Sequence, residues 1–168
     1  MDKKAYNGHP SQLCGVEEVR LVGGKGDGMR LLQVRNATGL EFTVAADRCA
    51  DIYRLIFKGD NMGYFSANGY VAPAYYDDIG TGFLKSFTAG FLTTCGLSTM
   101  GTGGEDAGEQ LPLHGTIGNT PCEHIYWTED DDNLMKEMWS DGKSITDIAE
   151  HFGRKESAII VRIKKLKL

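Results

Sequence analysis

The chain has 168 residues, a hydrophobic share of 41% and a formal net charge of −5 at pH 7. This hydrophobic share supplies a core and excludes global disorder, and the length fits one domain or one domain plus a small one. The acidic balance gives the whole molecule no bias toward nucleic acid. No apolar run approaches the roughly 20 residues of a membrane-spanning helix, and no secretory signal opens the chain. We therefore expect a cytoplasmic protein with no membrane partner.

Twenty of the 22 glycines precede Trp127, and only Gly142 and Gly153 follow it. Such a density of glycine disfavours helices and favours turns and short strands. We therefore predict two domains: a β domain at residues 1–126 and a small helical domain at residues 127–168.

Hydrophobic alternation predicts strands in the first domain. Residues 29–35 and 40–44 alternate, and the turn residues at 36–39 join them into an expected β-hairpin. The other predicted strands are residues 51–58, ended by the polar residues 59–61, and residues 91–95.

The glycine-rich run at residues 23–28 is not interpreted as a phosphate-binding loop. Such a loop leads into a helix whose N-terminus holds the anion. Here the run leads into the strand-like residues 29–35, so we expect a flexible hairpin connection.

The four cysteines, at positions 14, 49, 95 and 122, are widely spaced. No pair forms a CxxC motif, and no histidine stands at zinc-finger spacing from them. We therefore expect free thiols, no bound metal and no cofactor.

Charged side chains and histidine recur in the glycine-rich half, where they could bind sugar hydroxyls at the mouth of a β-sandwich. In order along the chain, these runs resemble the aldose 1-epimerase (galactose mutarotase-like) superfamily. The matching runs are GMR at 28–30 with RN at 35–36, DRCADI at 47–52, PAYY at 73–76, TTCGL at 93–97 and LPLHGTIGNTP at 111–121.

This resemblance implies an antiparallel β-sandwich and the interconversion of sugar anomers by a base and an acid. It also makes His114, in the LHG run, a carbohydrate-binding candidate. Arg48 and Asp51 are further candidates without a defined family role. Without the resemblance, His114 is better explained as a hydrogen-bonded histidine at the end of a strand; with it, the two explanations are equally good.

The chain departs from the superfamily near Trp127. The catalytic histidine and glutamate of the superfamily come from later strands and have no counterpart here, and Thr116 stands where an arginine is favoured. We therefore expect a sugar-binding domain that is catalytically incomplete, whose catalytic residues are unknown.

The second domain carries the signals of three helices. Thr128 with Asp131, and Ser144 with Asp147, predict two N-capped helices, and a third is expected from about Lys155 to the end. The segment resembles small helix-turn-helix modules of the Myb/SANT-like kind, which bind DNA through the last helix.

Charge partly supports that interpretation. Residues 153–168 contain six basic residues and one acidic residue, whereas residues 127–152 contain two basic and eight acidic residues. A solvated basic helix end or a protein-docking module would show the same pattern. The DNA-binding candidates are Arg154, Lys155, Arg162, Lys164 and Lys165.

Three hypotheses follow. The chain is a carbohydrate-binding, epimerase-like protein with a DNA-binding helix-turn-helix; or an active aldose epimerase, an isomerase; or a DNA-binding protein whose β domain only forms oligomers. Exposed strand edges would favour self-association in each case, so the expected partners are a sugar or sugar derivative, DNA, and a second copy of the chain.

Overall fold

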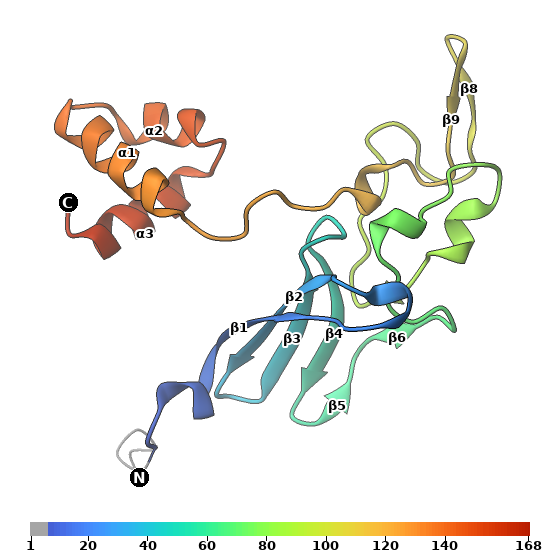
Figure 1. The fold of residues 1–168 in the computed structure, drawn as a ribbon, viewed down its shortest axis with the longest axis horizontal. Helices are drawn as coiled ribbons and strands as arrows, with labels where there is room; N and C mark the ends of the chain where they lie inside the picture. The colour runs from blue at the N-terminus through green and yellow to red at the C-terminus, as the bar shows by residue number, and fades with distance from the viewer. Residues whose placement is uncertain (1–6) are drawn as a thin grey trace. The chain divides into compact units, whose positions relative to one another are not determined.

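The structure is a computed structural model that describes residues 7–168. The chain separates into two compact units, one ending at Glu123 and the other spanning His124–Leu168. Figure 1 shows the β-rich first unit in blue to yellow and the helical second unit in orange to red. Each unit is described by itself.

A five-stranded antiparallel sheet is the main element of the first unit, with the strand order β1-β2-β3-β4-β5 (Figure 1). Each strand therefore pairs with its neighbour in the sequence. The strands are β1 (Cys14–Arg20), β2 (Arg30–Asn36), β3 (Leu40–Ala45), β4 (Asp51–Phe57) and β5 (Asp60–Asn61). The strands predicted at residues 29–35, 40–44 and 51–58 are thus confirmed.

The predicted hairpin between β2 and β3 is also confirmed. The side-chain Oδ1 of Asn36 accepts hydrogen bonds from the backbone N–H groups of Thr38 and Leu40, each at 3.0 Å. Ala37 and Gly39 both have positive φ. A Cβ at Gly39 would lie 2.9 Å from the Lys58 side chain, so glycine allows this turn to approach the next one.

Two sequence predictions differ from the structure, and one strand was not predicted. Residues 60–61 do not end the third strand but pair back onto it as β5, because Lys58 and Gly59 suffice for the turn. Residues 91–95 form no strand; only Leu92 makes an isolated bridge, with Ile52. β1 was not predicted, because the adjacent glutamates Glu17 and Glu18 interrupt its alternation.

The glycine-rich residues 23–28 connect β1 to β2 through a short 3-10 turn at Gly24–Gly26. The run leads into a strand, as expected, and not into a helix. The remaining strands form two ribbons, β6 (Tyr64–Phe65) with β7 (Ala89–Gly90) and β8 (Gly104–Asp106) with β9 (Glu109–Leu111). Within residues 7–123 the fold is therefore antiparallel β with one large sheet, and a second sheet of similar size is not present there.

One face of the large sheet carries the core of the first unit. Leu31, Ala45 and Tyr53 are buried there. Tyr53 packs against Phe65 and Tyr70, with ring centroids 6.0 and 5.4 Å away. Residues that follow the sheet in sequence thus fold back over this face.

The second unit has three helices, as predicted: α1 (Glu129–Ser140), α2 (Ile145–His151) and α3 (Glu156–Leu166). Both predicted capping boxes form, Thr128 with Asp131 and Ser144 with Asp147. The shared core of the helices comprises Met135, Ile148, Ala149, Ile159 and Ile163. Over the described residues, no helix is long and apolar enough to cross a membrane.

Candidate functional site

A groove of about 590 Å³ lies on the first unit. Residues 78–81 form one wall, and residues 102–104 with 110–113 form the other. The second wall includes the start of β8 and the end of β9. This volume lies within the range of small-molecule sites.

The groove combines hydrogen-bonding and apolar side chains. Asp78, Thr81, Thr102 and Gln110 supply a carboxylate, two hydroxyls and an amide. The apolar side chains among the lining residues are Ile79, Leu111, Pro112 and Leu113. Such a surface can bind a ligand that carries hydroxyl groups around a compact apolar frame.

Local contacts fix the first wall. The Asp77 carboxylate accepts hydrogen bonds from the Lys85 ammonium at 2.6 Å and from the backbone N–H of Ile79 at 3.0 Å. The ammonium of Lys85, together with the Ile79 N–H, lowers the pKa of Asp77 from its usual value. A Cβ at Gly82 would lie 2.3 Å from the Asp77 side chain, so a larger residue at position 82 would displace the Asp77 carboxylate.

The second wall is a tight hairpin. β8 and β9 pair from Gly104 with Leu111 to Asp106 with Glu109. A Cβ at Gly103 would lie 2.6 Å from the carbonyl oxygen of Leu111, so the two sides of the hairpin approach closely at the groove. The acidic run at residues 105–109 lies in this hairpin but does not line the groove.

His114 lies directly after the groove residue Leu113 but is not one of the lining residues. Its ring Nδ1 accepts a hydrogen bond from the backbone N–H of Gly101 at 3.2 Å, and the backbone N–H of His114 donates to the Gly101 carbonyl at 3.0 Å. A ring nitrogen that accepts is unprotonated, so a neutral ring carries its proton on Nε2. These bonds make His114 a support for the loop that leads to Thr102.

Arg48 is buried away from the groove, with 2% of its surface exposed. Its guanidinium donates to three carbonyl oxygens, those of Gly118 at 2.9 Å, Val71 at 3.0 Å and Ser86 at 3.2 Å. The side chain therefore ties together three loops that are distant in the sequence.

Asp51 is also buried, with 1% exposed, and accepts a hydrogen bond from the backbone N–H of Thr94 at 2.6 Å. Burial raises its pKa above the usual carboxyl value, while Thr94 and the Arg48 charge act in the opposite direction. Arg48 and Asp51 thus lie in a buried polar cluster, not among the groove residues.

Sequence reasoning missed other members of this cluster. The hydroxyl of Tyr53, the hydroxyl of Thr88 and the amide of Asn119 are buried, and the Thr88 hydroxyl lies beside that of Tyr53. Burial raises the pKa of the Tyr53 hydroxyl, against the nearby charge of Arg48. Their positions in runs of mixed polarity give no sequence signal of burial.

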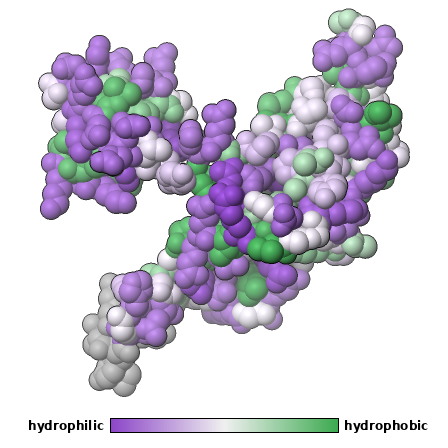
Figure 2. Space-filling model, in the orientation of Figure 1, coloured by the Kyte–Doolittle hydropathy of each residue, from purple (hydrophilic) through white to green (hydrophobic). Residues whose placement is uncertain are grey.

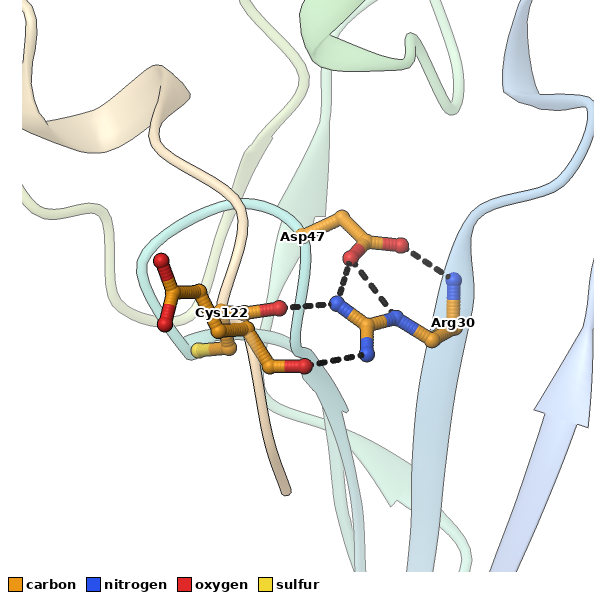
Figure 3. A network of polar contacts seen from close by, with 4 residues as sticks. Arg30, Asp47 and Cys122 are labelled. Carbon is orange, nitrogen blue, oxygen red and sulfur yellow. Dashed lines mark hydrogen bonds and ion pairs between the residues drawn. The ribbon is translucent and has the colours of Figure 1, made fainter.

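A second polar network, shown in Figure 3, closes one end of the sheet. The Asp47 carboxylate accepts hydrogen bonds from the Arg30 backbone N–H at 2.7 Å and from its Nε at 2.9 Å. The same guanidinium donates to the carbonyl of Cys122. Asp47, which raises the pKa of Arg30, thus pairs with Arg30 on β2 and holds the segment around Cys122 to the sheet.

In the helical unit, two of the five DNA-binding candidates are engaged internally. Arg162 on α3 forms a bidentate salt bridge with Asp132 on α1, in which the Arg162 Nε lies 2.6 Å from the Asp132 Oδ1. The Arg154 guanidinium lies 4.7 Å from the centre of the Trp127 ring. The other three candidates, Lys155, Lys164 and Lys165, are exposed.

The geometry can be compared with known proteins. A family described as "Domain of unknown function (DUF4432)" matches residues 26–154. The chain belongs to this family. The matched residues of this DUF4432 chain include the large sheet from β2 onward, the groove, α1 and α2.

One solved structure, from Klebsiella pneumoniae subsp. pneumoniae MGH 78578, is similar to the DUF4432 chain; its assignment as an aldose 1-epimerase is itself provisional. The two are 28% identical with a TM-score of 0.53, over 63% of this chain and 28% of that protein. The predicted resemblance to aldose 1-epimerases is thus confirmed as a partial likeness of fold, and the chain spans little more than a quarter of that protein. No curated protein matches the chain. The likeness of the helices to Myb/SANT modules finds no support and stays a prediction.

Proposed function

We propose that the first unit binds a carbohydrate or a similar polyhydroxylated molecule in the groove of residues 78–81, 102–104 and 110–113. The observation that carries this proposal is the lining itself: one carboxylate, two hydroxyls and an amide beside apolar side chains, in a volume of about 590 Å³. Carboxylate and amide groups bind sugar hydroxyls in pairs, and apolar side chains pack on the C–H face of a sugar ring.

The partial likeness to a provisionally assigned aldose 1-epimerase supports a sugar as the ligand. It does not by itself bring catalysis to this chain, because the chain spans 28% of that protein. Anomer interconversion requires a base and an acid on the same sugar. Asp78 is the single titratable side chain that lines the groove, so we propose binding without turnover.

Calorimetric titration of aldoses and sugar phosphates into the whole chain tests this proposal. We expect saturable binding that Asp78→Asn and Gln110→Ala each weaken about tenfold, which corresponds to the loss of one hydrogen bond to a charged or polar group. Asp106→Asn is the matched control, because Asp106 is exposed on β8 outside the groove. No binding by the folded protein, or equal weakening by the control, would overturn the proposal.

A mutarotation assay separates binding from catalysis. On a freshly dissolved α-aldose, we expect the protein to leave the rate of optical-rotation change at its spontaneous value. Acceleration that disappears in Asp78→Asn would establish an active epimerase instead, with an acid outside the residues named here.

A second candidate function rests on the charge of α3. Lys155, Lys164 and Lys165 are exposed in a segment with six basic residues and one acidic residue. Lysines in this arrangement can neutralise the phosphates of DNA. Arg162 is a weaker candidate for such contact, because its guanidinium already holds Asp132.

This second function is tested by DNA binding at several salt concentrations. A variant that changes Lys155, Lys164 and Lys165 to glutamine is preferable to one that includes Arg162, since loss of Arg162 also breaks the link between α1 and α3. We expect weak binding that falls steeply with salt and is lost in this variant. No binding at low salt would exclude the function.

A further inference from the structure

The five-stranded sheet has a second face, opposite the core of the first unit. In an antiparallel sheet, directly paired residues point to the same side, and alternate residues of a strand share a face. Val16 pairs with Val34, and Val34 with Phe42, which in turn pairs with Leu55. This row of four apolar side chains crosses four strands.

Two further rows extend the pattern. Leu32 pairs with Val44, and Val44 with Ile52, while Leu40 pairs with Phe57. A register shift between Phe42 and Val44 explains how Ile52 and Leu55, three residues apart, come to lie on one face. The apolar sheet face therefore consists of Val16, Leu32, Val34, Leu40, Phe42, Val44, Ile52, Leu55 and Phe57.

None of these nine side chains is buried, and Val16 and Phe57 are 62% and 45% exposed. The core of the first unit packs on the opposite face, around Leu31, Ala45 and Tyr53. Over the part of the first unit that holds the sheet, Figure 2 shows hydrophobic (green) patches among hydrophilic (purple) side chains. The apolar sheet face is thus as apolar as a protein core, but its side chains are not buried.

Size and charge indicate the occupant. With strands about 4.8 Å apart and alternate residues of a strand about 6.7 Å apart, the nine apolar positions cover roughly 290 Å². The charged positions at their margin raise the area of this face to roughly 400 Å². Two such faces bury roughly 800 Å² in total, which is the size of a weak or transient interface. One charged side chain stands in these rows: Glu18 on β1, which pairs with Leu32. Arg20 and Arg30 pair with each other at the next position of the same face, so the charges lie at the margin and are of both signs.

We propose that a second copy of this chain packs on the apolar sheet face, sheet against sheet, to form a sandwich between two molecules. Two sheets of the same twist pack face to face about 10 Å apart with interdigitating apolar side chains. A face without central charge meets no like-charge repulsion when a two-fold axis brings it onto itself. The second layer of the sandwich, which residues 7–123 do not supply, then comes from the partner copy.

Sedimentation of the whole chain over a range of concentrations tests this interface. We expect a mass that rises from 18.4 kDa toward twice that value, with a midpoint in the micromolar range. Val34→Lys, at the centre of the face, should raise the dissociation constant at least a hundredfold, and Val16→Lys, at its edge, at least tenfold. Gln33→Lys is the matched control, since it places the same charge on the same strand but on the opposite face.

Circular dichroism checks the fold of each variant. If Val34→Lys is unfolded, Val16→Lys decides, because Val16 is 62% exposed and its replacement removes little packing. A chain that stays monomeric at all concentrations would overturn the proposal, since another part of the chain or another protein would then have to cover the face. A dimer that both face variants leave intact would overturn it as well.

Discussion

Arg48 shows how a single residue can organise the loops of the first unit. Sequence reasoning proposed it as a sugar-binding residue, but its guanidinium is buried and donates to three backbone carbonyls. Those carbonyls belong to Val71, Ser86 and Gly118, so one side chain replaces the regular hydrogen bonding that these irregular segments lack. Unpaired buried carbonyls are costly.

We predict that Arg48→Met lowers the free energy of unfolding by about 3 kcal/mol, because three buried acceptors lose their donor while the shape of the stem is kept. Urea unfolding of the first unit measures this change. Arg20→Met is the control, since Arg20 is exposed on β1 and its loss should cost less than about 0.5 kcal/mol. Equal effects would show that the three bonds do not stabilise the fold.

Asp51 should make stability depend on pH. Burial raises its pKa above the ordinary 3.8, so the folded protein holds this proton more tightly than the unfolded chain. Its contribution to stability is therefore full below about pH 4 and is lost as pH rises through the folded pKa. Relative to wild type, Asp51→Asn should be least stable below pH 4 and should gain stability toward pH 7, as measured by unfolding at several pH values. A difference that is constant with pH would contradict this assignment.

At the scale of elements, local chemistry made the helices and the central strands predictable. Thr128 and Ser144 cap their helices through hydrogen bonds with residues three positions later. Both partners of each capping box are therefore close together in the sequence, and the start of the helix can be predicted from it. The hairpin of β2 and β3 is likewise set by alternation and by the turn at residues 36–39.

The parts that depend on distant residues were not predictable. The groove forms where residues 78–81 approach residues 102–104 and 110–113, and neither segment carries a sequence pattern that indicates the other. Arg48 and Asp51 stand in a polar run that would suit a binding site as well as a core. Only the contacts with Gly118 and Thr94 distinguish these roles, and such contacts have no local pattern.

The capping box at Thr128 gives a prediction for α1. Thr128→Ala removes the hydroxyl that accepts from the Asp131 N–H at 3.1 Å and should destabilise the helical unit by about 1 kcal/mol. Ser157→Ala, at an exposed position in the first turn of α3, is the control and should have little effect. Thermal unfolding followed by tryptophan fluorescence measures both changes, and an unchanged midpoint for Thr128→Ala would argue against the cap.

At the scale of the whole molecule, the two units have separate cores. Tyr53 and its neighbours form one core, and Met135, Ile148 and Ile159 belong to the other, with no residue in common. Units with separate cores can unfold separately. The chain offers a natural probe for this, because both tryptophans, Trp127 and Trp139, lie in the helical unit.

We predict that the two units unfold independently. Arg48→Met should lower the unfolding midpoint seen by the tyrosine and β-sheet signals and leave the tryptophan midpoint unchanged, whereas Thr128→Ala should do the reverse. Each variant thus serves as the control for the other, with circular dichroism and tryptophan fluorescence recorded on the same sample. If either substitution shifts both midpoints together, the units are coupled energetically. A ligand in the groove of the first unit could then alter the stability of α3, which is the physical requirement for one unit to regulate the other.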